Sequence, residues 1–202
     1  MCLHPIKQHL NHDNSSSNGG VVSPAQFSFF TRPVKNTRPS KSMSLWEVYL
    51  AIKSNQYQPQ TALLRTFAES VHAKEYKAKE FDYVTFSGTF TSRKNEGLIQ
   101  HSGYMSVDFD HLTEMKKLKA ALLKDPYFET DLLFKSPSGK GLKWIVSIDL
   151  AVYSHTEWFV AIEKYIKDGY DLQIDPACKD VSRGCFLPYD SEVYINPKYI
   201  QS

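Results

Sequence analysis

Two aspartates stand two positions apart at the end of a predicted strand, in the segment YMSVDFD over residues 104–110. Because side chains alternate along a strand, Asp108 and Asp110 are expected to project from the same face. Two neighbouring carboxylates repel each other unless a cation lies between them, and hard divalent ions such as Mg²⁺ or Mn²⁺ are the usual partners. The pair therefore indicates a metal site. The alternative is a solvated strand end, with Asp110 capping the helix that follows.

A glycine-rich turn in SPSGKGLKWIV, residues 136–146, is the second feature with chemical potential. Its glycines allow the backbone to approach a ligand, turn amides can form an anion-binding nest, and Lys140 supplies positive charge. On the strand that follows, Lys143 is expected to share the open face with the aspartates. The segment is no P-loop, because a strand follows it and Phe134 stands where the first glycine is needed. An ordinary glycine hairpin carrying a lysine is the alternative.

The third feature is QIDPACKDVSRGCFLPYD, residues 173–190. Asp175 precedes a proline that rigidifies its position, and Arg183 begins a predicted strand. The guanidinium group presents a fork suited to phosphate oxygens. A turn at Asp175 and a surface salt bridge at Arg183 are the alternative interpretation.

The elements that must position these residues follow from the hydrophobic pattern. Helices are predicted after Ser44, after Pro59, before Pro126 and over residues 156–167. Strands are predicted over residues 26–33, 82–90, 98–103 and 104–110, and a hairpin over 131–136 and 141–149. From Tyr104 onward, the order strand, helix, strand, strand, helix, strand predicts a sheet covered by helices on one face, with the other face free.

Side-chain alternation also predicts which residues are buried. The core face of the sheet is expected to comprise Met105, Val107, Phe109, Leu142, Trp144, Val146 and Ile148. The helix before Pro126 is expected to turn Leu112, Met115, Leu118, Leu122 and Leu123 inward. The helix after Pro59 is expected to carry an apolar stripe of Leu63, Leu64, Phe67 and Val71, and to continue as the solvated segment HAKEYKAKE.

Length and composition favour a single α/β domain. The chain has 202 residues, of which 42% are hydrophobic, and it holds no apolar run long enough to span a membrane. We expect residues 1–25, rich in Ser, Asn, Gly and His, to be a disordered tail, and residues 26–202 to form the domain. Cys2, Cys178 and Cys185 are too few for a disulfide scaffold, and the N-terminus does not resemble a signal peptide. These features favour a cytoplasmic protein.

Charge is distributed unevenly, although the net charge is only +2. Residues 1–43 contain one acidic residue, Asp13, and five basic residues: Lys7, Arg32, Lys35, Arg38 and Lys41. Such a basic arm is typical either of a solvated surface or of a contact with nucleic acid. Electrostatics alone does not decide between the two.

Together, the three segments resemble the three catalytic motifs of the archaeo-eukaryotic primase superfamily, the primase-polymerases. The segments SGTFTSR (87–93), HSGYMSVDFDHL (101–112), DPYF (125–128), SPSGKGLK and DVSRGCFLPYD (180–190) are similar to the N-terminal domain of virulence-associated protein E-like proteins of bacterial mobile elements. This resemblance covers residues 26–197. It implies an α+β fold with an RRM-like core, a mainly antiparallel sheet with helices on one face and an open catalytic face.

The resemblance also implies roles for individual residues. Asp108, Asp110 and Asp175 correspond to the acids that bind the catalytic Mg²⁺ or Mn²⁺ ions. Ser138, Lys140 and Lys143 would line the nucleotide phosphates, Arg183 would clamp them, and Arg93 is a weaker candidate for the same pocket. The chain departs from the superfamily pattern at Lys143, where the second motif ends in histidine. A lysine holds a phosphate as a point charge but does not replace a neutral imidazole.

The implied function is metal-dependent transfer of nucleotides to a 3′-hydroxyl in mobile-element DNA replication. The implied partners are a nucleoside triphosphate, single-stranded or primed DNA, and a helicase-type ATPase domain in cis or in trans. Two alternatives stay open. One is a catalytically degraded module that binds a nucleotide or single-stranded nucleic acid. The other is a metal-dependent phosphodiesterase, which the lack of a clear base for an attacking water disfavours.

Overall fold

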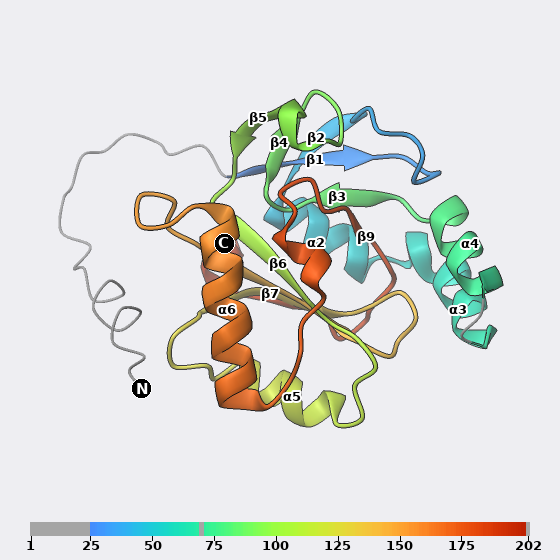
Figure 1. Ribbon diagram of the computed structural model, residues 1–202. Coiled ribbons are helices and arrows are strands. Elements are labelled where there is room, and N and C mark those ends of the chain that lie inside the picture. Colours follow the sequence, from blue (N-terminus) through green and yellow to red (C-terminus); the bar gives the residue numbers. More distant parts are fainter. Residues whose placement is uncertain (1–24, 69–70, 201–202) are drawn as a thin grey trace.

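The computed structural model describes residues 25–68 and 71–200 (Figure 1). All but the last residue of the predicted tail over residues 1–25 lies outside this part of the chain. The described residues form a mixed α+β fold built from antiparallel sheets and several helices. None of the helices in this part of the chain is long and apolar enough to cross a membrane.

The first sheet is antiparallel, with the strand order β2-β1-β3-β9. Its strands are β1 (Gln26–Phe30), β2 (Lys41–Ser44), β3 (Tyr83–Thr85) and β9 (Cys185–Phe186). A separate two-stranded ribbon is formed by β4 (Gly88–Phe90) and β5 (Leu98–His101). The strand predicted over residues 82–90 is therefore two strands, because a turn at residues 86–87 sends β4 out of the first sheet to pair with β5.

The second sheet is also antiparallel, with the strand order β10-β7-β8-β6. Its strands are β6 (Tyr104–Phe109), β7 (Thr130–Lys135), β8 (Leu142–Ser147) and β10 (Tyr194–Ile195). The predicted β7–β8 hairpin is confirmed, and β8 lies between β7 and β6. In the β6–β8 register, Asp108 is directly opposite Lys143.

The helices are α2 (Leu45–Lys53), α3 (Gln58–Thr66), α4 (Val71–Glu80), α5 (Met115–Leu122) and α6 (His155–Tyr170). The described residues also contain four short 3₁₀ turns: η1 (Asn55–Tyr57), η2 (Asn95–Gly97), η3 (Pro176–Lys179) and η4 (Pro197–Tyr199). Helix α2 begins after Ser44, as predicted, with a capping box in which the Ser44 side chain accepts from the Glu47 amide and the Glu47 side chain accepts from the Ser44 amide.

The helix predicted after Pro59 is shorter than expected. Helix α3 ends at Thr66, where Phe67 adopts an extended conformation, and α4 begins at Val71 as a separate helix. The predicted stripe is wrong at two positions, since Leu63 is 47% and Val71 is 68% exposed. The break allows the Phe67 ring to contact Tyr76 of α4 edge to face, with 5.2 Å between centroids.

One face of the second sheet packs as predicted. Helices α5 and α6 cover it, and the shared core includes Met105, Val107, Phe109, Leu118, Leu122, Leu142, Trp144, Val146, Trp158, Phe159, Ile162 and Ile166. Full burial of Phe109 and Trp144 confirms the predicted register of both strands. Leu123 lies at the edge of α5 and is more exposed than predicted.

The opposite face of the second sheet is covered, which corrects the expectation of an open face. Leu132, Phe134 and Ile145 project from it and pack against residues of the first sheet and α2. These apolar side chains require cover, and most of it comes from segments before residue 87, with β9 added from near the end of the chain. The predicted site residues near the end of β6 therefore lie between two layers.

Candidate functional site

Asp108 is the centre of a buried polar cluster where β6 and β8 meet. Its side chain is 2% exposed, and its carboxylate forms an ion pair with the Nζ of Lys143, its cross-strand neighbour. The Ser106 hydroxyl, two residues earlier on the same face, donates to Asp108 Oδ1 at 3.2 Å. The predicted shared face of these residues is confirmed, and the chemistry there is charge pairing in a buried environment.

The segment around η3 brings a second carboxylate to the cluster. The Asp175 amide donates to the Asp108 carbonyl at 2.9 Å, and Asp175 Oδ1 caps η3 by accepting from the Ala177 amide at 2.9 Å. The remaining oxygen of Asp175 forms an ion pair with the Arg183 guanidinium. Arg183 Nη2 also lies 3.5 Å from Asp108 Oδ2. Arg183 therefore bridges the two acids.

Both cations favour the ionised form of Asp108. Burial raises the pKa of the Asp108 carboxyl, but the Lys143 ammonium, the Arg183 guanidinium and the Ser106 hydroxyl outweigh it, so the pKa lies below its usual value. Burial lowers the pKa of Lys143, and the facing Asp108 carboxylate outweighs that effect and raises it. The cluster is accordingly a set of charged groups that neutralise one another.

Cys178 completes a group of potential metal ligands. A carboxylate oxygen of Asp108, a carboxylate oxygen of Asp175 and the Sγ of Cys178 all lie within 4.8 Å of one another. Burial, reinforced by the Asp108 charge, raises the pKa of the Cys178 thiol well above its usual value. The same causes raise the pKa of the nearby Cys185 to about 12. Because a thiol binds metal as the thiolate, the carboxylates are the effective donors at neutral pH.

Two histidines anchor the η3 segment. The Gly103 amide donates to His101 Nδ1 at 3.0 Å, which makes Nε2 of that ring the protonated nitrogen, and Nε2 lies 3.0 Å from His155 Nδ1. His155 Nε2 lies 3.4 Å from the Cys178 carbonyl, so it completes the chain as a donor. Burial and the neighbouring His155 lower the pKa of His101 to about 4. The neutral pair thus ties η3 to the end of β5.

Lys77 of α4 is a further cation whose charge interacts with the cluster, and the sequence pattern does not reveal it. It is half-buried, its Nζ lies 5.6 Å from the Phe186 ring centroid, and the charges of Asp110 and Arg183 act on it. Burial, and then repulsion from Lys143, lower the pKa of its ammonium group. The segment HAKEYKAKE predicts only a solvated helix face, and nothing in it distinguishes Lys77 from its lysine neighbours.

Asp110 is not part of the group formed by Asp108, Asp175 and Cys178. Strand β6 ends at Phe109, so the alternation that would align Asp110 with Asp108 stops one residue too early. Asp110 is exposed, and the next residue, His111, has a positive φ of 53°. The two aspartates of the first motif therefore occupy different surroundings.

The β7–β8 turn lies at the same end of the sheet and is held from two sides. Arg65 Nε of α3 donates to the Pro137 carbonyl at 3.3 Å, and the Leu112 amide donates to the Lys140 carbonyl at 2.9 Å. Ser138 and Lys140 are exposed on this turn, and Ser138 Oγ lies 3.1 Å from Ser136 Oγ. Both residues thus lie outside the ion-paired group.

Arg93 has other partners. Its Nε donates to the Tyr83 hydroxyl at 3.0 Å, its Nη2 donates to the Val34 carbonyl at 3.2 Å, and its guanidinium carbon lies 5.1 Å from the Tyr83 ring centroid. These contacts hold the connection between β1 and β2 against β3. Arg93 therefore supports a neighbouring loop rather than the ion-paired group.

The donor set is suited to one hard divalent cation, for which Asp108 and Asp175 would supply carboxylate oxygens. It does not fit a pair of ions, because Asp110 lies apart and the Lys143 and Arg183 cations already neutralise both carboxylates. Binding even one ion requires Lys143 to leave the Asp108 carboxylate. As it stands, the arrangement is a network of ion pairs in which Lys143 and Arg183 neutralise Asp108 and Asp175.

The fold and cluster define a mixed α+β domain with a charged site between its two sheets. The chain belongs to the family described as "BT4734-like, N-terminal domain", whose model matches residues 75–195, more than half of the chain. That region begins within α4 and includes Asp108, Lys143, Asp175, Cys178 and Arg183. Searches of the curated proteins and of the solved structures found no match.

Proposed function

We propose that this protein is a primase-polymerase-like domain that binds a nucleoside triphosphate at the Asp108 cluster and transfers nucleotides to a 3′-hydroxyl. The observation that carries the proposal is the convergence of three distant segments. Asp108 from β6, Lys143 from β8 and the pair Asp175 and Arg183 are joined by ion pairs and by one backbone hydrogen bond. These segments are the ones that resemble the three primase-polymerase motifs.

The strand arrangement supports an RRM-like core. The sequence β6-α5-β7-β8-α6, with β8 between β6 and β7, corresponds to the first five elements of a β-α-β-β-α-β unit. In such a unit the last strand lies beside the first, and here the segment containing Asp175 lies against the free edge of β6. The two-residue strand β10 pairs instead with β7, so the fourth strand is the part that departs from this arrangement.

The side chains supply what phosphate binding requires. Arg183 offers a fork for two oxygens, and Lys143 and Lys77 offer point charges from neighbouring elements. A divalent ion held by Asp108 and Asp175 would activate the 3′-hydroxyl and neutralise charge on the phosphates. Lys143 would be free to contact a triphosphate once it leaves Asp108.

A second candidate is a nucleotide-binding module without catalysis. The position of Lys143 favours it, because the ammonium group occupies the Asp108 carboxylate oxygen that an ion would need. In either case we place the protein in the cytoplasm, in mobile-element DNA replication, with single-stranded or primed DNA and a helicase-type ATPase domain as partners.

Primer extension and calorimetry with the full chain distinguish the candidates. With Mn²⁺, a primed template and labelled nucleotides, we expect extension that Asp108→Asn abolishes, while Lys164→Ala, on the exposed surface of α6, leaves it unchanged. Calorimetry should show triphosphate binding that Arg183→Lys weakens despite its unchanged charge, because the bidentate fork is lost. Binding without extension supports the second candidate, and absence of both contradicts the proposal.

A further inference from the structure

The connection between β1 and β2 concentrates positive charge on one surface. Residues 31–41 contain Arg32, Lys35, Arg38 and Lys41 and no acidic residue, and all four basic side chains are exposed. Neither Lys35 nor Arg38 forms an ion pair with another described residue. Their charges are therefore available to an external anion.

This basic loop, residues 31–41, is held firmly in place. The Val34 amide donates to the Ala78 carbonyl of α4 at 2.7 Å, and the Arg93 amide donates to the Thr37 carbonyl at 2.8 Å. The Tyr83 hydroxyl donates to the Asn36 carbonyl at 2.6 Å. Because the backbone is fixed from α4, β3 and the segment after β4, the basic side chains project from a preorganised platform.

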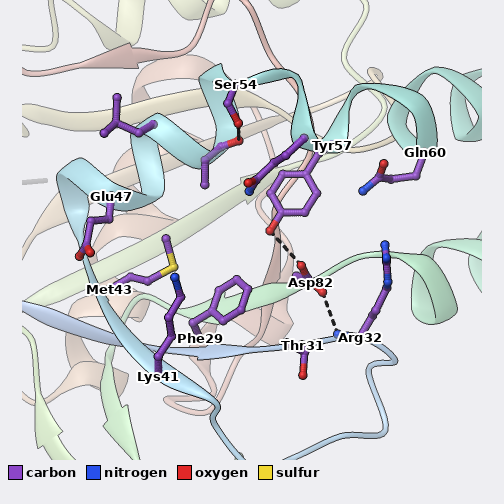
Figure 2. Close-up of a pocket in the computed structure, with 13 residues that line it drawn as sticks. Phe29, Thr31, Arg32, Lys41, Met43, Glu47, Ser54, Tyr57, Gln60 and Asp82 are labelled. Atoms are coloured by element: carbon purple, nitrogen blue, oxygen red, sulfur yellow. Dashed lines mark hydrogen bonds between the residues drawn. The ribbon is translucent and has the colours of Figure 1, made fainter.

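A hollow of about 650 Å³ opens beside the basic loop (Figure 2). Its apolar side is formed by Phe29, Met43 and Leu50, and Leu50 is 45% exposed. The loop contributes Arg32 and Lys41 to the rim, and Lys41 Nζ lies 5.2 Å from the Phe29 ring centroid. The hollow thus combines an apolar floor with a polar rim, as sites for small planar groups do.

The hollow and the loop differ in charge. Around the hollow, the carboxylates of Glu47 and Asp82 balance Arg32 and Lys41. Asp82 accepts from the Tyr57 hydroxyl at 3.0 Å and from the Arg32 amide at 2.8 Å, and both bonds are drawn in Figure 2. Glu47 accepts from the Ser44 amide at 2.7 Å. The hollow therefore suits a neutral group, whereas the loop suits a row of anions.

We propose that the basic loop and this hollow bind single-stranded nucleic acid. The backbone phosphates would lie along Lys35, Arg38 and the neighbouring basic residues, and one unstacked base would enter the hollow, with its polar edge toward the amides of Gln56 and Gln60. A duplex keeps its bases stacked and paired, so it cannot offer a base to the hollow. This surface goes beyond the proposed nucleotide site, because none of Asp108, Lys143, Asp175 and Arg183 lines the hollow.

The charge part of the proposal is tested by fluorescence anisotropy over a series of salt concentrations, with a labelled oligothymidylate and the full chain. In Lys35→Gln/Arg38→Gln, the slope of log affinity against log salt should fall by about 1.4, which is about 0.7 for each lost phosphate contact. The matched control is Lys164→Gln/Lys167→Gln on α6, which removes the same charge from a different surface. Equal slopes in both double variants would overturn the proposal.

The base-binding part is tested with an abasic strand of equal length and with a duplex. Leu50→Gln should weaken oligothymidylate binding several-fold and leave abasic-strand binding unchanged, because only the oligothymidylate has a base to place on the apolar floor. Equal affinity of the wild type for the oligothymidylate, the duplex and heparin would contradict the proposal, since it would indicate a general polyanion surface.

Calorimetry with Mn²⁺ and a nucleoside triphosphate separates this proposal from the nucleotide site. The Lys35→Gln/Arg38→Gln variant should bind the triphosphate like the wild type. If the wild type binds the triphosphate but not the oligothymidylate, this inference is overturned and the proposed function is not. Strand binding without triphosphate binding supports this inference and contradicts only the proposed function.

Discussion

The backbone amide of Asp175 donates a 2.9 Å hydrogen bond to the backbone carbonyl of Asp108. Strand β6 is at the edge of its sheet, so this bond attaches the segment before η3 to an otherwise free strand edge. The two acids are thus held together by the main chain, although their like charges repel each other. Arg183 offsets that repulsion by contacting both carboxylates. Substitutions of either side chain are expected to leave the main-chain arrangement intact.

Removal of Lys143 should destabilise the fold. In Lys143→Ala, the buried Asp108 carboxylate retains only the more distant Arg183 cation, and breaking a buried ion pair from one side costs about 3 kcal/mol or more. The double variant Asp108→Asn/Lys143→Met should recover most of that loss, because no buried charge is left unpaired. Urea denaturation measures both free energies of unfolding. A Lys143→Ala protein as stable as the wild type would show that the pair contributes nothing to stability.

Much of the second sheet is predictable because its signals are local. Alternation in β6 and β8 correctly predicts that Phe109 and Trp144 face the helices while Asp108 and Lys143 face away. The stripe of α6 is equally clear, with its buried residues spaced by one helical turn. Such patterns depend only on the periodicity of the element itself.

The remaining site features depend on tertiary contacts. The cover over the Asp108 face comes largely from β1, β3 and α2, which no pattern in β6 reveals. Lys77 lies over the Phe186 ring of β9, a contact between distant segments that its own helix pattern does not reveal. Asp110 differs from its prediction because the strand ends at Phe109, and strand ends are the least certain part of a sequence pattern. The motifs themselves, however, contain most of the residues that converge.

Substitution of Lys143 by histidine should strengthen divalent-ion binding at the cluster. At pH 8 the imidazole is neutral, so it no longer competes as a cation for the Asp108 carboxylate and it adds a nitrogen ligand. Lys143→Met removes the same charge without adding a ligand. Titration of Mn²⁺, followed by electron paramagnetic resonance of the free ion, should give an affinity for Mn²⁺ that increases from the wild type to Lys143→Met and again to Lys143→His. Equal affinities would show that Lys143 does not block an ion site.

Stability should fall as the pH decreases from about 6.5 to 4, in part because of His101. The folded protein lowers the pKa of His101 from 6.5 to about 4, so in this interval the unfolded chain binds more protons and protonation favours unfolding. The contribution is present above pH 6.5 and is lost toward pH 4, and because His101 is only partly buried and solvent screens its charge, its size is on the order of 1 kcal/mol. Urea denaturation at several pH values should show a smaller decrease for His101→Gln than for the wild type. A parallel decrease in both proteins would exclude this histidine as a source.

Gly141→Ala and Gly169→Ala should shift stability in opposite directions. A Cβ at Gly141 would lie 2.1 Å from the Phe109 carbonyl oxygen, so the β7–β8 turn and the end of β6 must separate. Crowding of this kind costs about 2 kcal/mol or more. A Cβ at Gly169, in the last turn of α6, would meet no atom within 4 Å, and alanine should stabilise the helix by up to about 1 kcal/mol. Thermal unfolding measures both changes. A Gly141→Ala protein with the wild-type melting temperature would show that this close approach is not required for the fold.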